Sequence, residues 1–156
     1  MRQEILNEKL PTFLEVIKKA NESDDPVSVL KEAIKKDSRI TNILGYAGNP
    51  NAKFPLPEGV PPYIPSEYPL GLAEVEILHL SNKLQVLFGP AHKAKKEEMY
   101  IQWLEKMNPE EAELLNAIKD QNISSLYPNI VEYVIVDALG WNHEMYENLK
   151  AKVKAK

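Results

Sequence analysis

Proline is concentrated in one stretch of the chain, and that stretch limits what the fold can be. Seven of the twelve prolines lie within residues 48–71. Proline fixes φ, has no backbone N–H and restricts the residue before it, so neither a helix nor a strand is expected there. The same stretch carries seven large apolar residues, which a flexible spacer does not need: Phe54, Leu56, Val60, Tyr63, Ile64, Tyr68 and Leu70. We predict an ordered, extended segment that packs over helices, and we call residues 48–71 the strap.

The chain before the strap has the pattern of three helices. Thr12 followed by Glu15 is a capping box, and the apolar residues from Phe13 to Ala20 then fall on one helical face. Asp25-Pro26 reads as an N-cap and a first-turn proline for a helix over 26–36. A third short helix is expected to begin at Ser38 and to end at the glycines 45 and 48. Ahead of these, Ile5, Leu6 and Leu10 predict a short helix interrupted by Pro11.

Helical spacing resumes after the strap. Apolar residues at helical spacing predict a helix over 72–88, which Gly89-Pro90 should end. One apolar face of this helix would contain Ala73, Ile77, Leu80, Leu84, Leu87 and Phe88. A helix over 95–107 should bury Met99, Tyr100, Trp103, Leu104 and Met107. Asn108-Pro109 with Glu111 repeats the capping-box pattern, and the helix that follows should bury Ala112, Leu115 and Ile118.

The segment 128–139 has two readings. Its run of β-branched residues favours a strand. Pro128 at its start and Gly140 at its end favour a helix with an apolar face, made of Ile130, Val131, Val134, Ala138 and Leu139. We prefer the helix, and expect a polar helix over 142–153 after it. The sequence therefore predicts one compact all-α domain over 1–156, with six or seven helices: a helical start at 1–47, the strap, and a helical remainder at 72–156 whose last residues fray.

The composition of the chain excludes several classes of function. The chain has 156 residues and no cysteine, so disulfides and thiol chemistry are excluded. The first residues carry charges every few positions and no apolar core, unlike a secretory signal, and no apolar run approaches the length of a membrane span. We therefore expect a cytoplasmic protein. The formal net charge of −4 gives no global attraction for nucleic acid.

Although the chain is acidic overall, its sequence contains two local clusters of lysines. One is a candidate basic patch at Lys93, Lys95 and Lys96, followed by Tyr100 and Trp103. Lysines beside aromatic rings can bind single-stranded nucleic acid, but both rings lie on the predicted apolar face, which favours a core role. The other cluster is the lysine-rich tail, Lys150, Lys152, Lys154 and Lys156. We interpret both clusters as solvated helix ends, where cations suit the C-terminal dipole.

A search for catalytic and metal-binding patterns finds none that is complete. The six glycines form no phosphate-binding loop, and no serine has a nucleophile-elbow context. Glu76 and His79 have the spacing used in dimetal helical bundles, but the second copy that such sites need is missing. His143-Glu144 lacks the second histidine of a zinc-protease motif. We interpret Glu110, Glu111 and Glu113 as first-turn acids favoured by the helix dipole. No cofactor or metal is expected, and we predict that the protein is not an enzyme.

Three motifs in order resemble a known family. They are LPEGVPPY at residues 56–63, MYIQWLE at 99–105 with EAELL at 111–115 and Lys119-Asp120, and LGWN at 139–142. The combination resembles small uncharacterised proteins of large contractile-tailed phages, including those of marine cyanobacteria, over residues 27–146. The resemblance implies a phage-encoded protein made in an infected bacterium, and it assigns no catalytic residue.

These observations lead to one functional expectation and one alternative. We expect a non-enzymatic phage accessory protein that binds a host or phage protein, with a candidate interaction surface on the strap at Phe54, Leu56, Tyr63, Ile64 and Tyr68. The competing explanation is that these side chains fill the protein's own core, which applies more to Phe54 and Leu56 than to the two tyrosines. The alternative function is a nucleic-acid-associated factor in phage replication or transcription that uses the basic patch.

Overall fold

The computed structural model describes residues 10–155, and within them the chain is all α-helical, as predicted. It has seven α-helices and no strand in that range: α2 (Phe13–Glu22), α3 (Pro26–Lys36), α4 (Arg39–Gly48), α5 (Lys93–Glu105), α6 (Pro109–Lys119), α7 (Glu132–Leu139) and α8 (His143–Ala155). Four short 3-10 helices connect them: η1 (Pro50–Ala52), η2 (Ile77–Leu80), η3 (Leu84–Phe88) and η4 (Ile123–Ser125). The short helix predicted at Ile5 and Leu6 lies outside the described residues.

Local capping explains where several helices begin. The Thr12 hydroxyl accepts from the Glu15 N–H at 3.2 Å and the Glu15 carboxylate accepts from the Thr12 N–H at 2.9 Å, so the predicted capping box is confirmed. Asp25 caps α3 in front of Pro26, and Asn108 caps α6 in front of Pro109. In each case a side-chain oxygen satisfies N–H groups that the first helical turn leaves free.

The residues predicted to cap the start of α4 and to end it are wrong in detail. Ser38 precedes α4, but its side chain makes no capping hydrogen bond. The carboxylate of Asp37, the residue before Ser38, instead accepts from the Arg39 N–H at 3.1 Å. Gly45 does not end the helix either, because α4 continues through it to Gly48.

The predicted helix over 72–88 is wrong, because this segment forms the two 3-10 helices η2 and η3. Residues outside the segment accept hydrogen bonds from the backbone N–H groups at its start. The N–H of Val75 donates to the carbonyl of Lys106 at 3.1 Å, and the N–H of Ile77 donates to the Glu111 carboxylate at 3.0 Å. The predicted apolar face is largely buried all the same, at Ile77, Leu80, Leu84 and Leu87. Ile77 and Leu80 in η2, like Leu84 and Leu87 in η3, are three residues apart, a spacing that places side chains on one side of a 3-10 helix. The step of four, from Leu80 to Leu84, falls in the turn between η2 and η3.

The ambiguous segment 128–139 is helical from Glu132 onward, so the preference for a helix is confirmed. Gly140 ends α7 at a φ of 74°, in the left-handed region that glycine adopts without strain. The predicted inward face is only partly right. Ile130 and Ala138 are buried, but Val131 is 44% exposed, because it precedes the helix as its N-cap residue. Ile135 and Val136 face the core in its place.

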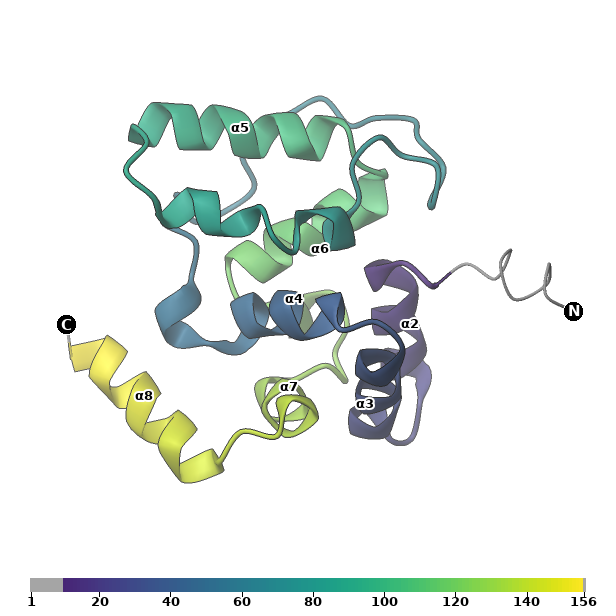
Figure 1. The fold of residues 1–156 in the computed structure, drawn as a ribbon, viewed down its shortest axis with the longest axis vertical. Helices are drawn as coiled ribbons and strands as arrows, with labels where there is room; N and C mark the ends of the chain where they lie inside the picture. Colours follow the sequence, from purple (N-terminus) through teal and green to yellow (C-terminus); the bar gives the residue numbers. More distant parts are fainter. Residues whose placement is uncertain (1–9, 156) are drawn as a thin grey trace, which may run out of the picture.

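The helices surround one continuous hydrophobic core. α2 and α3 form a pair at one side, and α4 lies in the middle in contact with both α6 and α7 (Figure 1). α5, η2 and η3 lie on the far side of α4 from α7, and α8 lies at the edge of the molecule. α4 and α7 approach closely at Gly48, where an added Cβ would lie 2.8 Å from Cγ2 of Ile135.

We therefore expect opposite effects from the same substitution at the two α4 glycines. Gly48→Ala should lower the free energy of unfolding by about 1–3 kcal/mol, because the buried, β-branched Ile135 has little freedom to move. Gly45→Ala should raise it by about 0.5–1 kcal/mol, because nothing lies within 4 Å of the new methyl group and alanine favours the helix. Urea unfolding measures both. Equal effects at the two positions would contradict the close contact.

Candidate functional site

The strap is an ordered segment attached to the corner between α5 and α6. The expectation that the strap contains no helix is wrong at its start, where Gly48 ends α4 and Pro50–Ala52 form η1. After η1 the strap runs along α5 toward the C-terminal end of that helix and then turns back toward η2 (Figure 1). Near α6, Lys119 Nζ donates to the carbonyl of Pro57 at 2.6 Å, and the Asp120 carboxylate accepts from the N–H of Gly59 at 3.0 Å. Gly59 has a φ of 89°, a left-handed conformation that allows the chain to turn into the rest of the strap.

Three further hydrogen bonds hold the middle of the strap against the end of α5 and the start of α6. The N–H of Ile64 donates to the Glu105 carboxylate at 2.9 Å. The Ser66 hydroxyl donates to the carbonyl of Met107 at 2.5 Å, and the side-chain amide of Asn108 donates to the carbonyl of Tyr68 at 2.9 Å. Groups of the folded body therefore hold residues 57–68 in place, a stretch whose one internal hydrogen bond runs from the N–H of Tyr68 to the Ser66 hydroxyl.

The five candidate interface residues divide between the core and the surface. Phe54 is buried, with its ring centroid 5.6 Å from that of Tyr46 and 6.3 Å from that of Tyr100. Leu56 and Tyr63 are half-buried and pack against the core. Ile64 is 77% exposed and Tyr68 is 38% exposed. Only Ile64 and Tyr68 are thus available to a partner, and Val60 and Leu72 add further exposed apolar side chains on either side of them.

Lys119 is the central anchor beneath the strap, and its role was not predicted. Its side chain is 2% exposed and pairs with Asp120 Oδ1 at 2.6 Å. Together with Tyr100 and Ile101 it lines a cavity of about 280 Å³ whose other wall is residues 56–62 of the strap. The Tyr100 hydroxyl donates to Asn116 at 2.7 Å, and burial raises the pKa of Tyr100. Because the ammonium charge is already paired with Asp120, the cavity offers no free cation to a ligand.

A sequence signal for this anchor exists. Lys119 lies four residues after Leu115 and seven after Ala112, both of which are buried, so it continues the apolar face of α6. A lysine on such a face must pair with an acceptor inside the protein. That pattern indicates a buried lysine, although it does not indicate that the acceptors would come from the strap.

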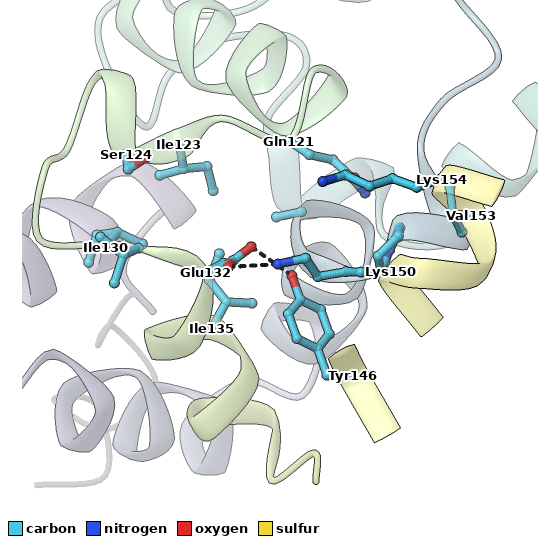
Figure 2. A pocket seen from close by; sticks show the side chains of 14 residues that line it. Gln121, Ile123, Ser124, Ile130, Glu132, Ile135, Tyr146, Lys150, Val153 and Lys154 are labelled. Carbon is cyan, nitrogen blue, oxygen red and sulfur yellow. Dashed lines mark hydrogen bonds and ion pairs between the residues drawn. The ribbon is translucent and has the colours of Figure 1, made fainter. Parts of the chain in front are cut away.

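A second pocket, of about 400 Å³, lies between η1, α7 and α8. Figure 2 shows Tyr146 and Lys150 of α8 pointing toward Glu132 of α7. Lys150 Nζ lies 2.9 Å from one Glu132 oxygen and the Tyr146 hydroxyl donates to the other at 3.2 Å. The hydrogen bond to Glu132 raises the pKa of Lys150, and burial raises the pKa of Tyr146. Both groups therefore keep their protons at neutral pH, and the arrangement holds α8 in place instead of offering a general base.

The basic patch lies at the opposite end of α5 from the middle of the strap. Lys93 and Lys95 are exposed and Lys96 is half-buried, all at the start of α5. The interpretation that this cluster suits a helix C-terminus is therefore wrong, because the N-terminal dipole is unfavourable for cations. For the tail it is right at Lys152 and Lys154, which lie in the last turn of α8, and wrong at Lys150, which is half-buried and paired with Glu132; Lys156 is outside the described residues. Tyr100 is buried and Trp103 packs against the core, as predicted.

Glu111 is the most perturbed carboxyl group, and it was wrongly interpreted as a simple first-turn acid. Its side chain is fully buried, and Oε1 accepts from the N–H of Ile77 at 3.0 Å instead of returning to Asn108. Oε2 has no hydrogen-bond partner among the described residues. Burial raises the pKa of Glu111 to about 7, although the N–H groups of Ile77 and Leu14 favour the ionised form.

The other acidic and histidine side chains do not gather into a site. Among residues 10–155, no three His, Asp or Glu side chains are placed to hold a metal ion. His79 is exposed, and its Nδ1 accepts from the N–H of Glu76 at 3.3 Å. His143 pairs with Asp137 at the protein surface. In the same range, no helix is long and apolar enough to cross a membrane.

Comparison with known proteins gives one match. The model of a family of unknown function, DUF6433, matches residues 13–125, from the first residue of α2 to the last residue of η4. The strap and its anchors lie inside the matched region, whereas α7 and α8, which form much of the second pocket, lie beyond it. No curated protein and no solved structure matches the chain.

Substitutions at two strap residues, one buried and one exposed, distinguish packing in the core from exposure on the surface. Phe54→Ala should lower the free energy of unfolding by about 3–5 kcal/mol, because it removes a buried ring and leaves a cavity. Ile64→Ala should change it by less than about 0.5 kcal/mol, because that side chain is mostly in solvent. Thermal and urea unfolding test both changes. A large loss at Ile64 would remove it from the candidate interaction surface.

Glu111 should make stability fall as the pH rises. A folded-state pKa of about 7, above the ordinary 4.5, contributes stability that is fully present below pH 4.5 and is lost as the pH rises through 7. The expected loss is about 3 kcal/mol. Glu111→Gln removes the titrating carboxyl group. The free energy of unfolding of this variant, relative to that of the wild type, should therefore increase between pH 5 and pH 8. The exposed Glu113→Gln is the matched control, and a parallel response of the two variants would contradict the assignment.

Proposed function

The chain belongs to the DUF6433 family, and we propose that it is a non-enzymatic protein-binding module that docks through its strap. The observation that carries the proposal is a line of exposed apolar side chains on a segment that is fixed to the folded body. Val60 and Ile64 in the strap and Leu72 just after it are each more than two-thirds exposed. Glu105 accepts from the N–H of Ile64 and Asn108 donates to the carbonyl of Tyr68, so the backbone between Val60 and Leu72 is held in place. Asp120 accepts from the N–H of Gly59, just before Val60.

The physical advantage of this arrangement is a low ordering cost. A flexible loop loses conformational entropy when it binds, and that loss reduces affinity. The strap has already lost this freedom through its prolines and anchors, so contacts with a partner contribute more of their energy to binding. Exposed Ile and Tyr side chains supply the apolar contact area that such a surface needs.

The proposal extends to the setting in which the protein acts. On the strength of the motif resemblance at residues 56–63, 99–120 and 139–142, we propose an accessory protein of a contractile-tailed phage, acting in the cytoplasm of the infected bacterium. Its partner is a host or phage protein. No reaction is assigned to the chain, because the buried Glu111 and the Glu132 cluster both have structural roles that account for their contacts.

A second candidate function rests on the basic patch. Lys93 and Lys95 lie in the first turn of α5, where the helix dipole adds to their positive charge instead of offsetting it. None of the three patch lysines forms an ion pair with another described residue. A local cationic surface of this kind suits phosphate groups, so a nucleic-acid-associated accessory factor is the alternative.

Affinity purification from infected cells tests the main proposal. The wild-type chain should retain a dominant host or phage protein, and Val60→Ser with Ile64→Ser should reduce its recovery at least tenfold. Leu126→Ser with Met145→Ser is the matched control, because it removes exposed apolar side chains far from the strap in sequence. Equal recovery by all three proteins would contradict a strap interface.

A gel-shift assay tests the alternative. If the patch binds nucleic acid, single-stranded DNA should shift at low salt, and the affinity should fall steeply as salt is raised. Lys93→Gln with Lys95→Gln should weaken the shift, whereas Lys152→Gln with Lys154→Gln, which removes the same charge from α8, should not. Recovery of nucleic acid alone from infected cells would replace the protein-binding proposal with this one.

A further inference from the structure

We propose that residues 60–70 of the strap form a ready-made polyproline II ligand for a partner protein with an aromatic-lined groove flanked by basic side chains. The central element is Pro62-Tyr63-Ile64-Pro65, which has the P-x-x-P spacing that such grooves accept. The inference rests on the proposed function, since it names the kind of partner that the strap would bind.

The first argument is conformational. Prolines at 61, 62, 65 and 69 fix their own φ near that of polyproline II and restrict the residues before them to extended conformations. The segment lies between two left-handed glycines, Gly59 at a φ of 89° and Gly71 at 86°, and has neither helix nor strand. No backbone hydrogen bond joins two residues within 60–70, and polyproline II likewise has no internal backbone hydrogen bonds.

The second argument is the pattern of exposure. Polyproline II has three residues per turn, so residues three apart lie along the same edge. Tyr63 and Ser66, three apart, are half-buried, and they face the body of the protein. Pro62, Pro65 and Tyr68, at the same spacing, are all exposed. Ile64 and Glu67 are exposed in the middle of the third edge, whose ends, Pro61 and Leu70, are half-buried. Over residues 62–68, one edge is thus anchored while two are exposed, which is the presentation that a groove requires.

The third argument is the availability of backbone acceptors. Among the described residues, no donor bonds to the carbonyl of any residue from Val60 to Glu67. Grooves that bind polyproline II carry aromatic side chains, and the Trp N–H and Tyr O–H donate to such carbonyls. The N–H of Ile64 is already used by Glu105, and the prolines have none. The carbonyls of residues 60–67 are therefore left free for the donors of a partner.

The fourth argument is charge. The segment 54–72 contains two charged residues, Glu58 and Glu67, and both are acidic. Glu58 pairs with Lys53. Glu67 is exposed and forms no ion pair with a described residue, and the neighbouring Glu105 adds a second negative charge beside Ile64. A complementary groove would carry Lys or Arg next to its aromatic side chains.

The test uses the full-length protein immobilised on resin, a lysate of infected cells, and a proline decapeptide as the competing probe. A partner with the proposed groove should be eluted by the decapeptide and by a synthetic peptide of residues 59–71, but not by a Gly-Ser decapeptide. Pro62→Ala with Pro65→Ala should reduce its retention at least tenfold, and Glu67→Lys should weaken it severalfold. Pro55→Ala with Pro57→Ala, which removes two prolines outside 60–70, is the matched control, and circular dichroism checks that each variant folds.

The outcomes separate the two proposals. One result would contradict the polyproline inference alone. In it, Val60→Ser with Ile64→Ser abolishes retention of the partner, whereas Pro62→Ala with Pro65→Ala retains it and the proline decapeptide does not elute it. The strap would then be an interface of another kind. If retention is indifferent to every strap variant, or if no protein is retained, both the strap interface and the polyproline inference fail.

Discussion

The buried carboxyl group of Glu111 connects parts of the chain that are otherwise far apart in sequence. It projects from the first turn of α6, accepts from the N–H of Ile77 at the start of η2, and lies close to the N–H of Leu14 in the first turn of α2. Two helix N-termini and one 3-10 helix thus meet around a single carboxyl group. The interaction is costly because one oxygen is left without a partner among the described residues, yet it holds the start of η2 against the first turn of α6.

The position of the strap follows from that arrangement. With α6 fixed at its start by Glu111, its far end places Lys119 and Asp120 where they hold Pro57 and Gly59. The connection between α5 and α6 then supplies the acceptors and donors at Met107 and Asn108. A buried acid at one end of α6 and a buried lysine at the other therefore place the strap against the same helical corner.

Local patterns predicted what depends on neighbours in sequence. The Thr12 capping box, the proline starts of α3 and α6, and the ordered strap were all evident from residues close together. Asn108-Pro109-Glu110-Glu111 has nearly the same pattern as the Thr12 box, but the Glu111 side chain bonds to a residue 34 positions away. The apolar spacing at 77–87 fits one α-helix, but it also fits two 3-10 helices whose apolar residues are three apart, with the step of four falling between them. Tertiary hydrogen bonds such as that from Ile77 to Glu111 are not visible in the local pattern. The division of the strap into anchored and exposed edges depended on Glu105 and Lys119, which no local pattern could connect to it.

The attachment of α8 has a consequence for motion. Tyr146 is the one buried hydrophobic residue among residues 143–154 of α8. The ion pairs of Lys150 with Glu132 and Glu147 involve partly exposed groups, which contribute little to stability. A helix held so lightly opens at a fraction of the free energy that unfolds the whole chain. Amide protons of α8 should therefore exchange with solvent through local detachment, while those of α4 and α6, at the centre of the core, exchange only when the entire fold opens.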